Sequence, residues 1–60
     1  MNKEITYRYH VYAINKNGIA KIDTRTDDNK SVYMVVQDLK DNHVSGYVFD
    51  SVLKKVSEQF

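Results

Sequence analysis

The apolar positions of residues 49–60 recur with the period of a helix. They fall on one stripe of a helical wheel, and polar residues occupy the other faces; the stripe contains Phe49, Val52, Leu53, Val56 and Phe60. Asp50 or Ser51 can cap the start by accepting hydrogen bonds from unpaired backbone N–H groups. The pattern predicts an amphipathic helix over residues 50–59. Such a helix must pack on an apolar surface, because helices shorter than about 12–15 residues are marginal alone in water.

Residues 5–14 instead alternate with a period of two, which is typical of a strand. One face carries Ile5, Tyr7, Tyr9, Val11 and Ala13, and the other carries Thr6, Arg8, His10, Tyr12 and Ile14. The first set is the more apolar one. We therefore expect it to lie beneath the helix and the second set to face outward.

Asn17-Gly18 marks the turn to a second strand, residues 19–26, because Asn-Gly suits the positive φ angles of a two-residue hairpin loop. That loop pairs Val11 with Thr24 and His10 with Arg25. A four-residue loop would place Arg8 opposite Arg25, an unfavourable pair of like charges. The two-residue loop is the preferred register, and both registers keep the same faces.

The segment 31–39, which follows a polar turn at residues 27–30, fits two patterns. Val32, Val35, Val36 and Leu39 suit a helical stripe, whereas residues 32–36 form a β-rich apolar run. Its shortness and its three valines favour a strand. Residues 40–43 read as another tight turn. Residues 44–49 read as a fourth strand, in which Gly46 marks a bulge or a close approach of backbones.

These elements predict an α+β fold in a single domain, residues 1–60. Its sheet is a four-stranded antiparallel meander with strands at 5–14, 19–26, 31–39 and 44–49. One C-terminal amphipathic helix packs on one face of that sheet, and the other face stays open to solvent.

Composition narrows the possible functions. The chain has 60 residues and no cysteine, so no disulfide can support its small core, and its two histidines stand apart rather than in a metal-binding cluster. Small proteins of this kind often gain stability by oligomerising, and we expect a homodimer or a larger homo-oligomer.

The net charge of +1 is not that of a strongly basic nucleic-acid binder. No membrane span or signal peptide is recognisable, so a cytoplasmic location is expected.

The open face carries the candidate functional residues. Basic side chains alternate there with tyrosines, a combination that suits single-stranded nucleic acid, since cations attract phosphates and rings stack on bases. The candidate nucleic-acid-binding residues are Arg8, Tyr12, Lys21, Arg25 and Tyr47. Two other interpretations stay open. The face is an ordinary solvated surface, or Tyr12, Tyr33 and Val35 meet the sheet of a second copy.

No residue pattern indicates catalysis. Asp27 and Asp28 are adjacent and point apart in a turn, and neither His10 nor His43 has an evident nucleophile or orienting partner. Phosphate-loop and zinc signatures are absent from the sequence. We therefore expect a non-enzymatic protein that uses no metal and no cofactor.

Two short stretches resemble the positive-cofactor-four (PC4-like) family of transcriptional coactivators. Lys21-Ile22-Asp23-Thr24-Arg25 is similar to a strand of that family, and residues 44–48 are similar to its entry into the closing helix. Thr26-Asp27 stands where the family has a tryptophan. The resemblance implies a ββββα fold that binds single-stranded DNA as a dimer, and only Lys21 and Arg25 carry over by position.

Two functional hypotheses follow. The first is a small oligomeric protein that engages single-stranded or distorted DNA, plausible for a phage or mobile element in an anti-defence (anti-CRISPR-like) role. The second is an inhibitor that covers a host protein with its tyrosine-rich sheet face or an edge strand.

Overall fold

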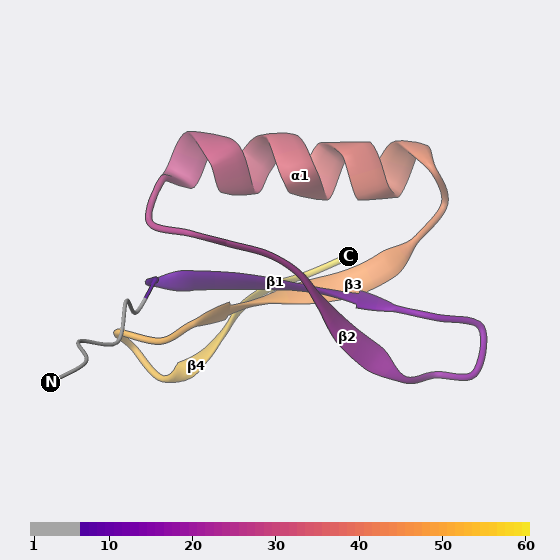
Figure 1. Cartoon of the computed structure of the whole chain (residues 1–60), viewed down its shortest axis with the longest axis horizontal. Helices are drawn as coiled ribbons and strands as arrows, with labels where there is room; N and C mark the ends of the chain where they lie inside the picture. The colour runs from indigo at the N-terminus through magenta and orange to yellow at the C-terminus, as the bar shows by residue number, and fades with distance from the viewer. Residues whose placement is uncertain (1–6) are drawn as a thin grey trace, which may run out of the picture.

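The computed structural model describes residues 7–60, which form one antiparallel sheet with one helix on it (Figure 1). The element order is ββαββ: β1 (Tyr9–Ile14), β2 (Ala20–Thr26), α1 (Asn29–Asp41), β3 (Ser45–Asp50) and β4 (Lys55–Gln59). Three of the four predicted strands are confirmed with small shifts in their bounds. Residues 5 and 6, which the sequence assigns to the first strand, lie outside the described residues.

The strand order in the sheet is β2-β1-β3-β4, so β1 and β3 lie in the centre. The predicted meander is wrong in this respect, because β3 pairs with β1 rather than with β2. Helix α1 causes the difference: it carries the chain from the edge strand β2 over β1 to the far side, where β3 is added (Figure 1).

The segment 31–39 is helical, and its prediction as a strand is wrong. The stripe of Val32, Val35, Val36 and Leu39 faces the sheet, as the alternative pattern indicated. Asp28 caps the helix by accepting a hydrogen bond from the backbone N–H of Lys30 (3.2 Å). The valines cost helix propensity only modestly, whereas their burial against the sheet is worth more.

Helix α1 ends in a Schellman motif. The backbone N–H of His43 donates to the carbonyl of Lys40 (2.9 Å) and that of Val44 to the carbonyl of Leu39 (2.9 Å). His43 takes the left-handed position, with φ of 61°, where glycine is the common residue. The predicted tight turn at residues 40–43 is therefore the last part of the helix and its cap.

The predicted C-terminal helix over residues 50–59 is also wrong. Asp50 does accept backbone hydrogen bonds, from the N–H groups of Val52 (3.0 Å) and Leu53 (3.1 Å), but these organise a turn and not a helix start. Lys54, with φ of 57°, then reverses the chain into β4. Since α1 already covers one face of the sheet, these last residues pair with β3 at its edge.

The hairpin between β1 and β2 lies where Asn-Gly predicts it, but its loop has three residues. The carbonyl of Asn15 accepts from the N–H of Gly18 (2.9 Å), and the N–H of Asn15 donates to the carbonyl of Ile19 (3.0 Å). Gly18 has φ of 80°, as the third residue of such a loop requires. A bulge at Asp23 then restores the predicted pairs Val11–Thr24 and His10–Arg25.

The core is small and lies between α1 and the sheet. Its buried side chains are Val11, Val32, Val36 and Val48, and Tyr9, Val35, Leu39 and Phe60 pack around them. The predicted orientation is confirmed for the part of the first strand that forms β1, since Val11 is fully buried and Tyr9 joins the core, whereas Tyr7 precedes β1 and is 37% exposed. What covers Val11 and Tyr9 is α1 and not a C-terminal helix.

Gly46 is the close-approach point that the sequence suggested. The ring of Phe60 lies over it, and the two residues exchange backbone hydrogen bonds of 3.0 Å in both directions. A Cβ at this position would collide with the carbonyl oxygen of Tyr12 and lie 2.8 Å from Cζ of Phe60. Because Gly46 has no side chain, Phe60 can lie against it and cover one side of the core.

Candidate nucleic-acid interface

Residues 7–60 leave the sheet face opposite α1 uncovered, and that face carries a row of rings. Directly opposed residues of antiparallel strands share a face, so the register places side chains from all four strands there. We call the following set the ring face: His10, Tyr12, Ile22, Arg25, Tyr47, Phe49 and Val56.

Two cross-strand pairs form the centre of the ring face. The rings of Tyr12 and Tyr47 stack with centroids 4.9 Å apart and planes 21° from parallel. His10 meets Phe49 edge to face, with centroids 6.4 Å apart and an angle of 66°. Nε2 of His10 also lies 2.8 Å from the carbonyl oxygen of Tyr7, which fixes the imidazole. The rings are therefore held in place by one another and by the strands.

The charge of the ring face has one sign. Arg25 lies opposite His10, and none of the strand positions that the structure assigns to this face is Asp or Glu. The acidic strand residues Asp50 and Glu58 share the helix side with Val48 and Tyr9. Asp23, the extra residue of the bulge, accepts a hydrogen bond from the Thr24 hydroxyl (3.0 Å). The paired strand positions of this face thus combine aromatic rings with the cation of Arg25.

The structure brings together three of the five predicted site residues. Tyr12, Tyr47 and Arg25 lie on the ring face, whereas Lys21 is paired with Ala13 and so belongs to the helix side. The three-residue loop explains the error, because a slip of one residue moves a side chain to the other face. Between that loop and the bulge, Ile22 takes the outward position that was predicted for Lys21.

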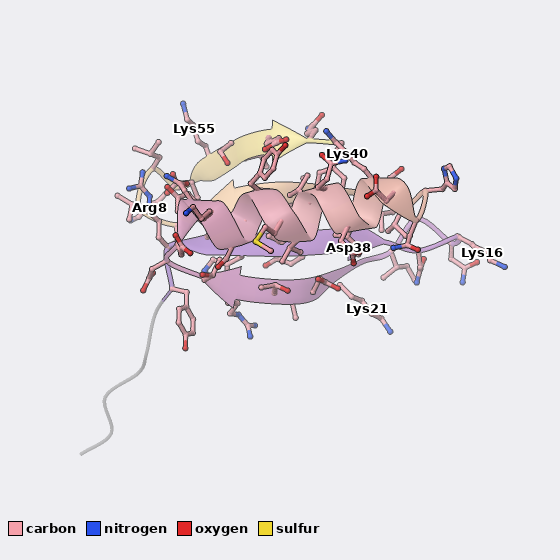
Figure 2. All side chains as sticks on the ribbon, turned by 90° about the horizontal axis from the view of Figure 1, so that it is seen from above. Arg8, Lys16, Lys21, Asp38, Lys40 and Lys55 are labelled. Atoms are coloured by element: carbon pink, nitrogen blue, oxygen red, sulfur yellow. The ribbon has the colours of Figure 1, made fainter. Side chains whose placement is uncertain are left out.

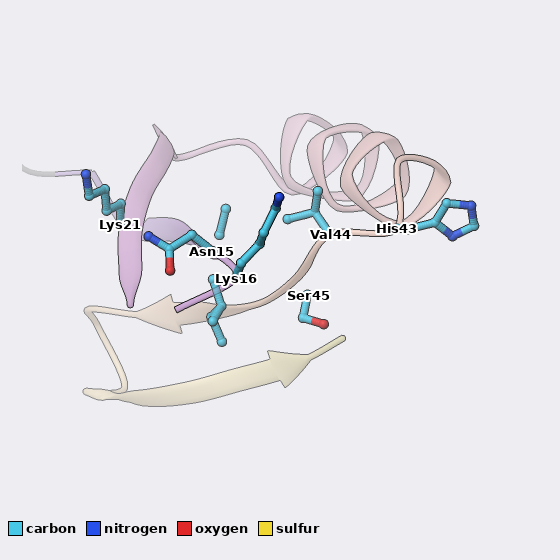
Figure 3. Close-up of a pocket in the computed structure, with 8 residues that line it drawn as sticks. Asn15, Lys16, Lys21, His43, Val44 and Ser45 are labelled. Carbon is cyan, nitrogen blue, oxygen red and sulfur yellow. The ribbon is translucent and has the colours of Figure 1, made fainter. Parts of the chain in front are cut away.

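Lys21 instead borders a hollow of about 660 Å³ at the hairpin end of the sheet (Figure 3). The hollow lies between the β1–β2 turn and the start of β3, and its lining includes Lys16, Ala13 and Val44. His43 belongs to the lining as well, but its ring points away from the other side chains (Figure 3). The hollow therefore does not bring the imidazole of His43 together with the other polar side chains that line it.

Arg8, the fifth candidate, is held by an ion pair. Its Nε and Nη2 atoms donate to the carboxylate of Asp50 at 3.0–3.2 Å, and the guanidinium lies 5.1 Å from the ring centroid of Tyr9. The hydrogen bonds from Arg8, and those from the N–H groups of Leu53 and Val52, hold the pKa of the buried Asp50 below its ordinary value. The same hydrogen bond to Asp50 raises the pKa of Arg8. Arg8 thus ties the residue that precedes β1 to the last residue of β3.

Sequence reasoning missed part of the ring face. His10 was placed on the correct face but not chosen, while Phe49 and Val56 were assigned to the stripe of a helix that does not form. The signal that could have found Phe49 is the alternation of residues 45–50, in which Tyr47 and Phe49 share one face. Val56 joins them because it pairs with Phe49.

Other kinds of site receive no support from the residues that the structure describes. In that part of the chain, no group of three His, Asp or Glu side chains is arranged to hold a metal ion. Nor is any described helix long and apolar enough to cross a membrane.

The chain matches no family model, no curated protein and no solved structure. The resemblance to positive-cofactor-four proteins is therefore limited to the short stretches that suggested it. The element order also differs, because the helix stands between β2 and β3 rather than after the last strand. The fold defines the protein only as a small α+β protein with a four-stranded antiparallel sheet and one helix.

Proposed function

We propose that the ring face binds single-stranded nucleic acid and that the protein acts by binding rather than by catalysis. The observation that carries the proposal is the gathering of four ring side chains and Arg25 on the uncovered face, with no acidic residue at the strand positions described there. Aromatic rings stack on any base, worth roughly 1–3 kcal/mol per base, and Arg25 can pair with a phosphate. DNA and RNA share this chemistry.

The geometry suits a short, sequence-tolerant contact. The two ring pairs lie on the central strands β1 and β3, and Arg25 flanks them on β2. Strands are spaced about 4.8 Å apart, so the four strands span roughly 15 Å, which two or three stacked nucleotides can cover. Because Tyr12 and Tyr47 stack on each other, bases would approach their outer faces and the rings of Phe49 and His10.

Fluorescence anisotropy with a labelled oligothymidylate tests the proposal. We expect binding at low salt that weakens as salt rises, and a tenfold or greater loss in Tyr12→Leu and Tyr47→Leu, which keep the apolar bulk. Arg25→Gln should lower the salt slope by about 0.7, the value for one phosphate contact with a single strand. Tyr33→Leu is the matched control, since Tyr33 is 69% exposed on α1. Absence of binding at low salt, or an equal loss in the control, would refute the proposal.

A second candidate function, the covering of a host protein, draws on a different feature of the same face. Tyr12 and Tyr47 already occupy one face of each other's ring, and Ile22 (37% exposed) and Val56 (42% exposed) add an apolar margin. Tyr and Arg are enriched at the energetic centres of protein interfaces. This role would suit an inhibitor carried by a phage or mobile element.

A pull-down from nuclease-treated lysate separates the two functions. A partner retained by the wild type and by Tyr33→Leu, but lost with Tyr12→Leu, would favour protein recognition. Loss of every partner after nuclease treatment would favour nucleic acid.

A further inference from the structure

We infer that two copies of this chain pair through β4, antiparallel and about a twofold axis, so that two four-stranded sheets become one. Strand β4 is one end of the sheet, and all of its residues are exposed. Figure 2 shows it lying beyond the helix, with Lys55 projecting past the edge. An edge strand of this kind presents unpaired backbone groups, which a second strand can satisfy.

The charges of the two edge strands distinguish them. Lys55 and Glu58 lie near opposite ends of β4 and both on the helix side, so antiparallel pairing in the register that opposes these two positions brings Lys55 of each chain to Glu58 of the other. Opposite charges across paired strands are favourable. On β2, pairing about its centre would set Asp23 opposite Asp23 of the second copy, which is unfavourable. Both edges carry a bulge, so the charges decide.

Exposed apolar side chains lie at the β4 edge of the sheet. Val52 is 63%, Leu53 55% and Val56 42% exposed, all within the β3–β4 turn and β4. Among residues 7–60, four hydrophobic side chains are buried in the core beneath α1. A second copy along β4 would cover part of this apolar surface and add to a core that is small for a folded domain.

The pairing would also enlarge the ring face. A twofold axis relating antiparallel neighbouring strands stands perpendicular to the sheet, so it leaves both helices on one side and both ring faces on the other. Val56, which pairs with Phe49 on the ring face, would lie at the junction. Although the pairing does not depend on the proposed function, it would present one longer surface to a nucleic acid strand.

Sedimentation equilibrium at micromolar to 100 µM concentrations tests this inference. We expect a dimer whose dissociation constant rises about tenfold or more in Lys55→Glu and in Glu58→Lys, because each change places like charges together at two symmetric positions. The double variant Lys55→Glu/Glu58→Lys should restore association. Lys16→Glu, which changes the net charge equally in the distant hairpin turn, should leave it unchanged.

Four results would overturn the inference, and the first three concern the charge variants and the assembly itself. They are a monomer at the highest concentration, no restoration by the double variant, and an equal loss of association in Lys16→Glu. A dimer that is lost in Tyr12→Leu but kept in Lys55→Glu would also overturn it, since that pattern places the contact on the ring face. Far-UV circular dichroism of each variant confirms that the compared chains are folded.

Discussion

Replacing Gly46 with alanine is the most direct test of how the end of the chain closes the core. The added Cβ would lie 2.8 Å from Cζ and 3.1 Å from Cε2 of Phe60, and it would collide with the carbonyl oxygen of Tyr12. The ring could move, but the carbonyl belongs to the central strand β1, whose groups pair on both sides. Relief therefore requires a shift of the β1–β3 pairing.

The magnitude follows from two opposed effects. Forcing an additional methyl group into a packed site costs typically about 1–3 kcal/mol. Against this, replacing glycine lowers the entropy of the unfolded chain and returns roughly 0.4–1 kcal/mol. A net loss of about 1–2 kcal/mol is expected, out of a total stability of about 3–9 kcal/mol for a chain of this length.

Urea unfolding followed by far-UV circular dichroism measures this loss directly. The double variant Gly46→Ala/Phe60→Leu should not recover wild-type stability, because the collision with the Tyr12 carbonyl remains. Gly18→Asn is the control: a Cβ at Gly18 has no heavy atom within 4 Å, and asparagine tolerates positive φ. A Gly46→Ala protein as stable as the wild type would contradict the described pairing.

Three further predictions concern stability. His43→Gly should raise the free energy of unfolding by about 0.5–1 kcal/mol, seen as a higher urea midpoint, because glycine takes the left-handed C-terminal position of α1 without strain. Val11→Ala should lower the free energy of unfolding by about 2 kcal/mol in the same assay, because two buried methyl groups are lost and a cavity is left behind. The lowered pKa of Asp50 means that its contribution is present above the ordinary pKa of an aspartate, about 3.9, and is lost as pH falls through the lower folded value. Thermal melts should therefore show Asp50→Asn less stable than wild type at pH 7, with the difference shrinking below about pH 4; a constant difference down to pH 2 would contradict the ion pair with Arg8.

The elements that were predicted correctly are those whose local sequence pattern is compatible with a single secondary structure. Alternation in residues 5–14 predicted the strand that contains β1, Asn17-Gly18 located the hairpin, and the strand predicted at residues 44–49 corresponds to β3. The elements that were predicted wrongly depend on competition between distant segments. Residues 31–39 and 49–60 both carry a helical stripe, and only one helix can cover the single face of the sheet.

The candidate site residues also divide into those fixed by local pattern and those fixed by distant parts of the chain. Tyr12 and Tyr47 lie on the predicted face because their alternation is local, and Arg25 does so because the bulge at Asp23 offsets the extra loop residue before it. Lys21 was misplaced because a loop with one more residue reverses the face of the strand segment that follows it. The ion pair of Arg8 could not be predicted because its partner Asp50 is remote in sequence and suits the cap of the predicted helix.

Asp50 connects these observations, since one buried carboxylate decides what residues 50–59 become. It binds the Arg8 guanidinium and the N–H groups of Val52 and Leu53, so it fixes a turn at the point where a helix could have begun. That turn sends β4 back along β3 and leaves Phe49 on the ring face. Were residues 50–59 helical, the edge formed by β4 would be lost, and Val56 would no longer lie beside Phe49. The ion pair of Arg8 and Asp50 therefore supports the proposed binding face without belonging to it.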